Sequence, residues 1–212
     1  VSEPPTIPLA RPSFDERELS AVKDVLDSGW VVQGPRVERF EQRIAELHGA
    51  AHAVAVTSGT AALQLVLSEA LDGDAPQSVL IPSYAWPSAA NLTAAFDAEP
   101  VFVDCLPDTY NLDPADLRAK AAPADGARGE PTVIVAVHEF GLAADLAAVL
   151  AVAEQHGLTV VEDAACALGA RYGDRPVGTF GAAGIFSFHP RKAVVTGEGG
   201  AVVTDDDDLA ER

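Results

Sequence analysis

The residues best suited to chemistry in this sequence are a lysine and a pair of carboxylates. Lys192 lies in a mostly apolar, glycine-flanked segment, where an amine with few polar neighbours is suited to Schiff-base chemistry. Glu162 and Asp163 follow a run of apolar residues, and a carboxylate there is costly unless it pairs with a cation or a protonated nitrogen. Because side chains alternate along a strand, only one of the two can face a shared ligand. The alternative for Lys192 is a surface lysine in a hairpin.

Two further features could bind a planar, phosphorylated ligand. Ser58, Gly59 and Thr60 stand at a predicted strand-to-helix turn, where backbone N–H groups and the helix dipole form an anion site. The same residues could instead only cap the helix. The turn matches neither GxGxxG nor GxxxxGK[ST], so a dinucleotide site and a P-loop are unsupported. Trp86 ends the next predicted strand, where its indole could stack on a flat ring or pack in the core.

Taken together, these residues meet the needs of one cofactor, pyridoxal 5'-phosphate. That cofactor requires an anion site, a flat side chain against its ring, a carboxylate that keeps the pyridine nitrogen protonated, and an amine that bonds to its aldehyde. The sequence therefore predicts a pyridoxal phosphate site, provided that the fold brings these residues to one place.

The strands and helices that must position these candidate residues alternate along the chain, as in an α/β fold. Seven apolar runs predict strands over residues 53–57, 78–81, 101–103, 132–136, 158–162, 184–188 and 200–203. Helical patterns cover residues 14–26, 35–48, 60–71, 87–96, 114–121 and 143–156. We expect Ser13 to cap the first helix and Ser28-Gly29 to end it. The short link between the last two strands favours an antiparallel return, so we predict a mostly parallel seven-stranded sheet with helices on both faces. Ligands of such sheets bind at the carboxyl ends of the strands.

Composition narrows the class of protein. The 212 residues carry 14 Lys+Arg against 32 Asp+Glu, and the net charge of -18 disfavours binding to nucleic acid or to an anionic membrane surface. No apolar run is long enough to span a membrane, and the first residues lack the regions of a signal peptide. Two cysteines form no disulfide framework, and no metal-ligand spacing is present. We therefore expect a soluble cytoplasmic protein without a metal.

Several motifs resemble the DegT/DnrJ/EryC1/StrS family of sugar aminotransferases. They are SGTAAL, IPSYAWPSAAN, PVFVDCLPDTYNLDP, EDAACALGARY and FSFHPRKAVVTGEGG, together with the opening IPLARPSFDERELSAVKDVLDSGWVVQGPRVERFEQ. The resemblance spans essentially the whole chain. It implies the fold-type I (aspartate aminotransferase-like) architecture, a homodimer with active sites at its interface, and transfer of an amino group from glutamate or glutamine to the keto carbon of a nucleotide-linked sugar.

The resemblance also assigns a role to each candidate residue. Lys192 would be the lysine that bonds to the cofactor and later moves a proton at the substrate carbon, and Asp163 would hold the pyridine nitrogen. The other implied cofactor contacts are Gly59, Thr60, Ala61 and Ser187 at the phosphate, Trp86 against the ring, and Cys166 near the ring hydroxyl. Cys166 departs from the family, where many members have Gln or His, and a thiol is a weaker donor.

The length of the chain is a second departure from the family. We expect residues 1–35 to form an N-terminal arm and helix and residues 36–212 to form the cofactor-binding large domain, without the C-terminal small domain that members usually have. The chain is thus either a fragment of a longer enzyme or a shortened protein. Alternatives to the nucleotide-sugar substrate are a cyclitol ketone, or a non-catalytic, regulatory member of the same fold. A dehydratase branch that has histidine in place of the lysine is disfavoured by Lys192.

Overall fold

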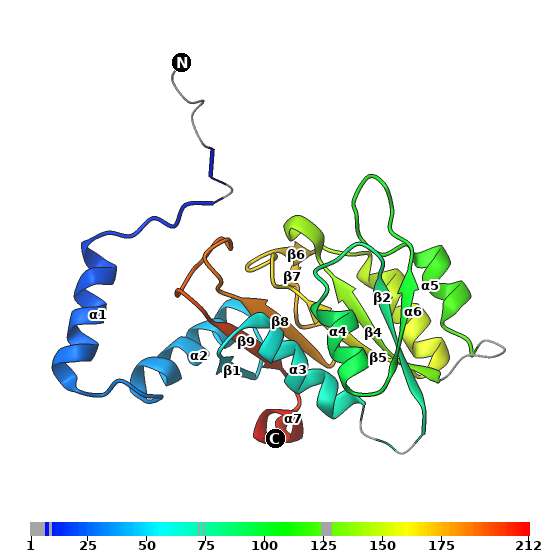
Figure 1. Ribbon diagram of the computed structural model, residues 1–212, viewed down its shortest axis with the longest axis horizontal. Coiled ribbons are helices and arrows are strands. Elements are labelled where there is room, and N and C mark those ends of the chain that lie inside the picture. Colours follow the sequence, from blue (N-terminus) through cyan, green and yellow to red (C-terminus); the bar gives the residue numbers. More distant parts are fainter. Residues whose placement is uncertain (1–6, 9, 72, 74, 124–128) are drawn as a thin grey trace.

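A seven-stranded sheet forms the centre of the computed structural model, which describes residues 7–8, 10–71, 73, 75–123 and 129–212 (Figure 1). Its strands are β1 (His52–Val56), β2 (Gln77–Pro82), β3 (Glu99–Val103), β4 (Glu130–Val137), β5 (Thr159–Asp163), β8 (Ala183–Ser187) and β9 (Gly200–Thr204). Their order is β1, β9, β8, β5, β4, β2, β3. Only β9 is antiparallel to its described neighbours, β1 and β8. The predicted fold class, with one antiparallel strand, is confirmed.

Helices cover both faces of this sheet. They are α1 (Glu16–Ser28), α2 (Pro35–His48), α3 (Gly59–Ala70), α4 (Ser88–Ala95), α5 (Pro114–Lys120), α6 (Leu146–His156) and α7 (Asp207–Glu211). Buried residues of α2, α5 and α6 form one core with one face of the sheet, and those of α3 and α4 form a second core with the other face. A short 3-10 turn η1 (Glu139–Gly141) and a hairpin of β6 (Arg171–Tyr172) and β7 (Arg175–Pro176) complete the described elements, and the sequence patterns did not predict them.

The start of the first helix differs from the prediction. Ser13 is exposed and lies outside α1, and Asp15 is the N-cap instead. The Asp15 side chain accepts a hydrogen bond from the Arg17 amide, and the Glu18 side chain accepts one from the Asp15 amide, which makes a capping box. The predicted end is confirmed, because Gly29 adopts the left-handed conformation that closes the helix.

The N-terminal segment is less closely packed than the rest of the chain. No residue of α1 is buried, and α1 lies apart from the sheet in Figure 1. By contrast, α2 buries Ile44 and His48 against the body of the protein. Residues 1–6 and 9 of the predicted arm lie outside the described residues. The division of the chain at residue 35 stays a prediction.

Strand β5 shows how the sheet sorts the two adjacent carboxylates. Val160 and Glu162 point to the face covered by α6, whereas Val161 and Asp163 point to the face covered by α3.

Among the described residues, no helix is long and apolar enough to cross a membrane. In the same part of the chain, no cluster of His, Cys, Asp or Glu could hold a metal ion.

Candidate active site

A cavity of about 400 Å³ opens at the carboxyl ends of β5 and β8, beside the N-terminus of α3. Six of the eight predicted site residues line it: Gly59, Thr60, Trp86, Asp163, Ser187 and Lys192. Ala61 and Cys166 are not among the lining residues. The fold therefore brings residues that are more than 130 positions apart into one site, as the rule for parallel sheets predicts.

One end of the cavity is built from the first turn of α3. The Ser58 side chain caps this helix and accepts a hydrogen bond from the Ala61 amide at 3.1 Å, so the amide of Ala61 is already paired. Gly59 is buried, and a Cβ atom there would lie 2.9 Å from the Cβ of Ser187. A Cβ on Gly200 would lie 2.3 Å from the Ser58 carbonyl oxygen. Glycine at these two positions lets β8 and β9 approach the turn closely, which leaves Thr60 and Ser187 at the positive end of the helix dipole.

Asp163 supplies a buried anion to this cavity. Its Oδ1 accepts a hydrogen bond from the Ala165 amide at 3.0 Å. Burial raises the pKa of Asp163, against the lowering effects of the Ala165 hydrogen bond and of the charges of Lys192 and His138. A carboxylate in this position is stabilised by a cationic partner, so the site fits a ligand with a protonated nitrogen.

Lys192 faces the same cavity from the segment after β8. Its Nζ lies 3.0 Å from the Cys166 Sγ, and its backbone amide donates to the His189 carbonyl at 2.8 Å. The amide of Phe188 donates to the carbonyl of Gly199, which closes the base of this segment. The lysine therefore lies beside Cys166 and lines the cavity, in the segment that joins the antiparallel strands β8 and β9.

Trp86 lies on the open side of the cavity. Its side chain is 67% exposed, so the alternative that it packs in the core is wrong. The guanidinium carbon of Arg191 lies 5.8 Å from the centroid of the indole ring. A flat side chain that lines the cavity and keeps its surface accessible can stack on a planar ligand.

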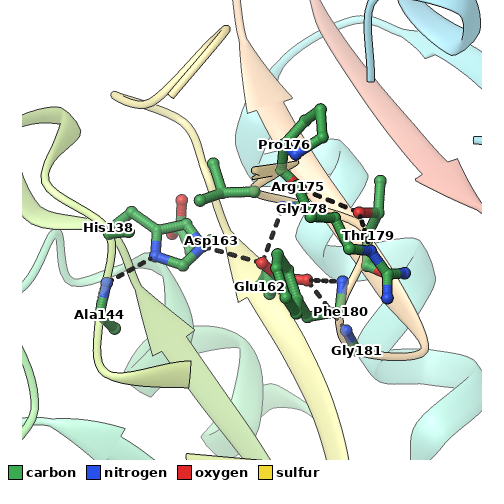
Figure 2. A network of polar contacts seen from close by, with 12 residues as sticks. His138, Ala144, Glu162, Asp163, Arg175, Pro176, Gly178, Thr179, Phe180 and Gly181 are labelled. Atoms are coloured by element: carbon green, nitrogen blue, oxygen red, sulfur yellow. Dashed lines mark hydrogen bonds and ion pairs between the residues drawn. The ribbon is translucent and has the colours of Figure 1, made fainter. Parts of the chain in front are cut away.

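A second carboxylate, Glu162, is buried on the opposite face of β5 and holds the loops around the site (Figure 2). It accepts hydrogen bonds from four groups: the His138 Nε2 at 3.0 Å, the Gly178 amide at 2.7 Å, the Gly181 amide at 2.9 Å and the Phe180 amide. The Ala144 amide donates to the His138 Nδ1, which leaves the ring proton on Nε2.

Burial raises the pKa of Glu162, but the hydrogen bonds from His138 and the backbone amides outweigh it, so the net pKa is lowered. The carboxylate therefore stays ionised and fixes the end of β5 next to Asp163.

Several lining residues escaped the sequence analysis. They are Ser88, Ala165, Ile185, His189, Arg191 and Glu198. His189 and Arg191 belong to the same segment as Lys192, and that proximity was a usable signal. The buried pair of His138 and Glu162 was harder to predict from the sequence, because a histidine at the end of a strand has many possible partners.

Comparison with known proteins agrees with this geometry. Residues 12–212 match the model of the DegT/DnrJ/EryC1/StrS aminotransferase family. DesI, solved in the presence of its TDP-sugar product, is 40% identical, with a TM-score of 0.82 over 94% of this chain and 49% of that one. Helicobacter pylori PseC, an aminotransferase involved in the biosynthesis of pseudoaminic acid, is 30% identical, with a TM-score of 0.87 over 96% of this chain and 53% of that one.

The putative sugar aminotransferase Spr1654 from Streptococcus pneumoniae, solved in a pyridoxal phosphate form, is 28% identical, with a TM-score of 0.86 over 96% of this chain and 54% of that one. The chain thus spans about half the length of the solved structures that it matches. Within that half, its fold agrees with theirs, and the chain belongs to the DegT/DnrJ/EryC1/StrS aminotransferase family, which depends on pyridoxal phosphate.

Proposed function

We propose that this chain is the cofactor-binding half of a cytoplasmic aminotransferase that moves an amino group from an amino acid, glutamate or glutamine, to the keto carbon of a nucleotide-linked sugar. The observation that supports it most directly is that Lys192 and Asp163 share one cavity with the N-terminal turn of α3. An amine, a buried anion and an anion-binding turn are what pyridoxal phosphate needs.

Each described residue would hold a different part of the cofactor. Gly59, Thr60 and Ser187 would bind the phosphate at the positive end of α3, with Ala61 behind them in the same turn. When bound, the cofactor supplies an aldehyde that exchanges amino groups and a ring that withdraws electrons from the reacting carbon. Trp86 would stack on that ring, and the stacking would fix the ring against the face of the sheet.

The two charged residues would do the chemical work of the protein. Asp163 would keep the ring nitrogen protonated, because a buried carboxylate is stabilised by a positive neighbour. Lys192 would form the covalent link to the cofactor and then carry a proton to and from the substrate carbon. Cys166, at 3.0 Å from Nζ, would contact the ring hydroxyl and the lysine.

The N-terminal segment supports the proposal of a homodimer. α1 carries apolar side chains that are mostly exposed, among them Leu19, Val22 and Leu26, and Trp30 and Val31 follow them. A helix with an uncovered apolar face in so acidic a chain needs a partner surface. We infer that a second copy covers it. No nucleic acid or membrane partner is proposed.

The first experiment tests cofactor binding. Purified chain is mixed with pyridoxal phosphate, reduced with borohydride and digested, and the modified peptide is identified by mass spectrometry. We expect modification at Lys192 and its loss in Lys192→Ala, with an unchanged circular dichroism spectrum. A chain that takes up no cofactor would favour the regulatory, non-catalytic alternative.

The second experiment tests the substrate. The full-length gene product is assayed for glutamate- or glutamine-dependent amination of a panel of nucleotide-linked keto-sugars and cyclitol ketones. Amination of a nucleotide-linked sugar supports the proposal, whereas amination of cyclitol ketones alone would replace the substrate class with the cyclitol alternative.

A further inference from the structure

Cys166 is a free, exposed thiol in direct contact with the amine of the proposed active site. Its Sγ lies 3.0 Å from the Lys192 Nζ. The other cysteine, Cys105, is half-buried, and its Sγ accepts a hydrogen bond from the Ser83 hydroxyl at 3.9 Å. The sequence contains no methionine, so these two thiols are the sulfur atoms that an oxidant can modify. Of the two, Cys166 is the more accessible, and it has an amine beside it.

The backbone that carries Cys166 is fixed from two sides. A hydrogen bond of 2.8 Å between backbone groups closes the turn over residues 164–167, which contains Cys166. A Cβ added to Gly141 would lie 3.1 Å from the Cys166 carbonyl oxygen, so η1 packs closely against this turn. η1 is itself held in place, because the Glu139 amide donates to the Asn111 Oδ1 at 2.9 Å.

The backbone that carries Lys192 is fixed as well. The Lys192 amide donates to the His189 carbonyl at 2.8 Å, and the Thr196 amide donates to the Phe188 carbonyl at 3.1 Å. Two reactive groups that are held in contact behave as if each were present at a very high concentration. A reaction between the Lys192 Nζ and the Cys166 Sγ therefore needs movement of the two side chains and none of the backbone.

We propose that Cys166 is an oxidation-sensitive modification site: hydrogen peroxide converts its thiol to a sulfenic acid, and the Lys192 amine condenses with that acid to form a covalent S–N bond, a sulfenamide. The proposal rests on the proposed function only for its consequence. A lysine held in this bond has no free amine with which to bind pyridoxal phosphate, so oxidation switches off cofactor uptake.

Both steps balance with hydrogen peroxide as the oxidant. The Cys166 thiolate attacks one peroxide oxygen, the O–O bond breaks, the sulfur is oxidised by two electrons, and the departing hydroxide takes up the thiol proton to become water. The neutral Lys192 Nζ then attacks the sulfur. The S–N bond forms, the S–O bond breaks, and the departing hydroxide leaves as water with one amine proton. A small thiol such as dithiothreitol reverses the modification, because it attacks the sulfur and releases the amine.

The first test looks for the bond itself, without any cofactor. Purified chain is treated with hydrogen peroxide at mildly alkaline pH, its remaining thiols are blocked, and it is digested without reductant and analysed by mass spectrometry. We expect a joined pair of peptides that links Cys166 to Lys192 and is lighter than the two reduced peptides by two hydrogen atoms. Cys105→Ser is the matched control and should give the same joined pair.

Two variants should not form the joined pair. Cys166→Ser lacks the sulfur. Lys192→Arg keeps the positive charge but has no nucleophilic amine, so the Cys166 sulfenic acid should persist in it and be trapped by dimedone. Circular dichroism checks that each variant is folded, and Lys192→Gln repeats the test if Lys192→Arg is not.

Three results would overturn the proposal. The first is a Cys166 that is oxidised to the sulfinic acid while Lys192 stays unmodified. The second is a disulfide between Cys105 and Cys166. The third is a joined pair that keeps one oxygen atom, since it would show an N–O–S bridge in place of the S–N bond.

The second test measures the consequence for the cofactor. Wild-type chain, before and after peroxide, is mixed with pyridoxal phosphate and freed of excess by gel filtration, and the bound cofactor is measured by its absorbance. We expect uptake to fall in proportion to the joined fraction and to return after dithiothreitol, in the wild type and in Cys105→Ser alike. The uptake of Cys166→Ser should be the same before and after peroxide. Full uptake by the joined chain would overturn the switch.

The two tests separate the two proposals. If the untreated chain takes up no cofactor, the proposed function fails, and the joined peptides still decide whether the S–N bond forms. If the untreated chain takes up the cofactor and no joined peptides appear, only the inference about Cys166 fails.

Discussion

Glu162→Gln should strongly destabilise the fold, although the change replaces one oxygen by one nitrogen. In the structure, Oε1 accepts from the amides of Phe180 and Gly181, and Oε2 accepts from His138 and Gly178. A glutamine can keep one pair, but its NH₂ group then opposes the other two donors. His138 cannot switch its proton to relieve this, because its Nδ1 accepts from a backbone amide.

The magnitude follows from the two lost acceptors. A buried donor left unsatisfied costs about 1 to 3 kcal/mol, so two of them cost about 2 to 6 kcal/mol of unfolding free energy. That is a large part of the roughly 5 to 15 kcal/mol that stabilises a domain. Urea unfolding followed by circular dichroism measures the difference, and Glu154→Gln at an exposed site should change it by less than about 0.5 kcal/mol. A loss below 1 kcal/mol in Glu162→Gln would refute this account of the network.

The pH dependence checks the same network independently. Folding lowers the pKa of Glu162, so this residue contributes stability above its unfolded pKa, and the contribution is lost as the pH falls through the folded value. Acidification below 4.5 should therefore destabilise the wild type more steeply than Glu162→Gln. Parallel stability curves for the two proteins would contradict this reasoning.

Three further predictions concern other parts of the chain. Asp163→Asn should make the cofactor-free chain more stable at pH 7 in urea unfolding, because a buried charge is removed. In the full-length enzyme it should raise the activation free energy by several kcal/mol, on the order of the effect of other preorganised charges. Near-normal turnover would argue against a role for Asp163. Trp30→Glu should shift light scattering from dimer to monomer, and a monomeric wild type would refute the dimer. Gly200→Ala should lower the free energy of unfolding in urea and weaken the uptake of pyridoxal phosphate, because the new Cβ would lie 2.3 Å from the Ser58 carbonyl oxygen. An unchanged free energy of unfolding together with unchanged uptake would show that the turn can move.

The sheet was predictable because its strands are nearly continuous apolar runs. The segment around Val160 and Val161 can only be buried on both faces, and alternation then sends the next two residues to opposite sides. Alternation thus predicts that one of the two carboxylates faces the ligand, and the family resemblance selected Asp163. The true cap of the first helix also has a signal in the sequence, because Asp15 and Glu18 have the spacing of a capping box.

Other parts of the site left no pattern to detect. Glu139 is one acidic residue in a short loop, and nothing in its neighbours signals that it is buried. Its environment depends on Asn111, 28 positions earlier, and on the loop that contains Cys166. Such groups depend on contacts between loops, and only the folded chain brings those loops together.

The placement of β9 between β1 and β8 has a consequence for how the protein folds during synthesis. β1 lies at the edge of the sheet, and in the part of the chain that the structure describes its sheet partner is β9, with His52 opposite Thr204. Contacts between residues so far apart in sequence form slowly, because a long loop must close first. A nascent chain therefore emerges with β1 unpaired until residues 200–204 leave the ribosome, and Gly200 can pack against the turn at Ser58 only after that late step.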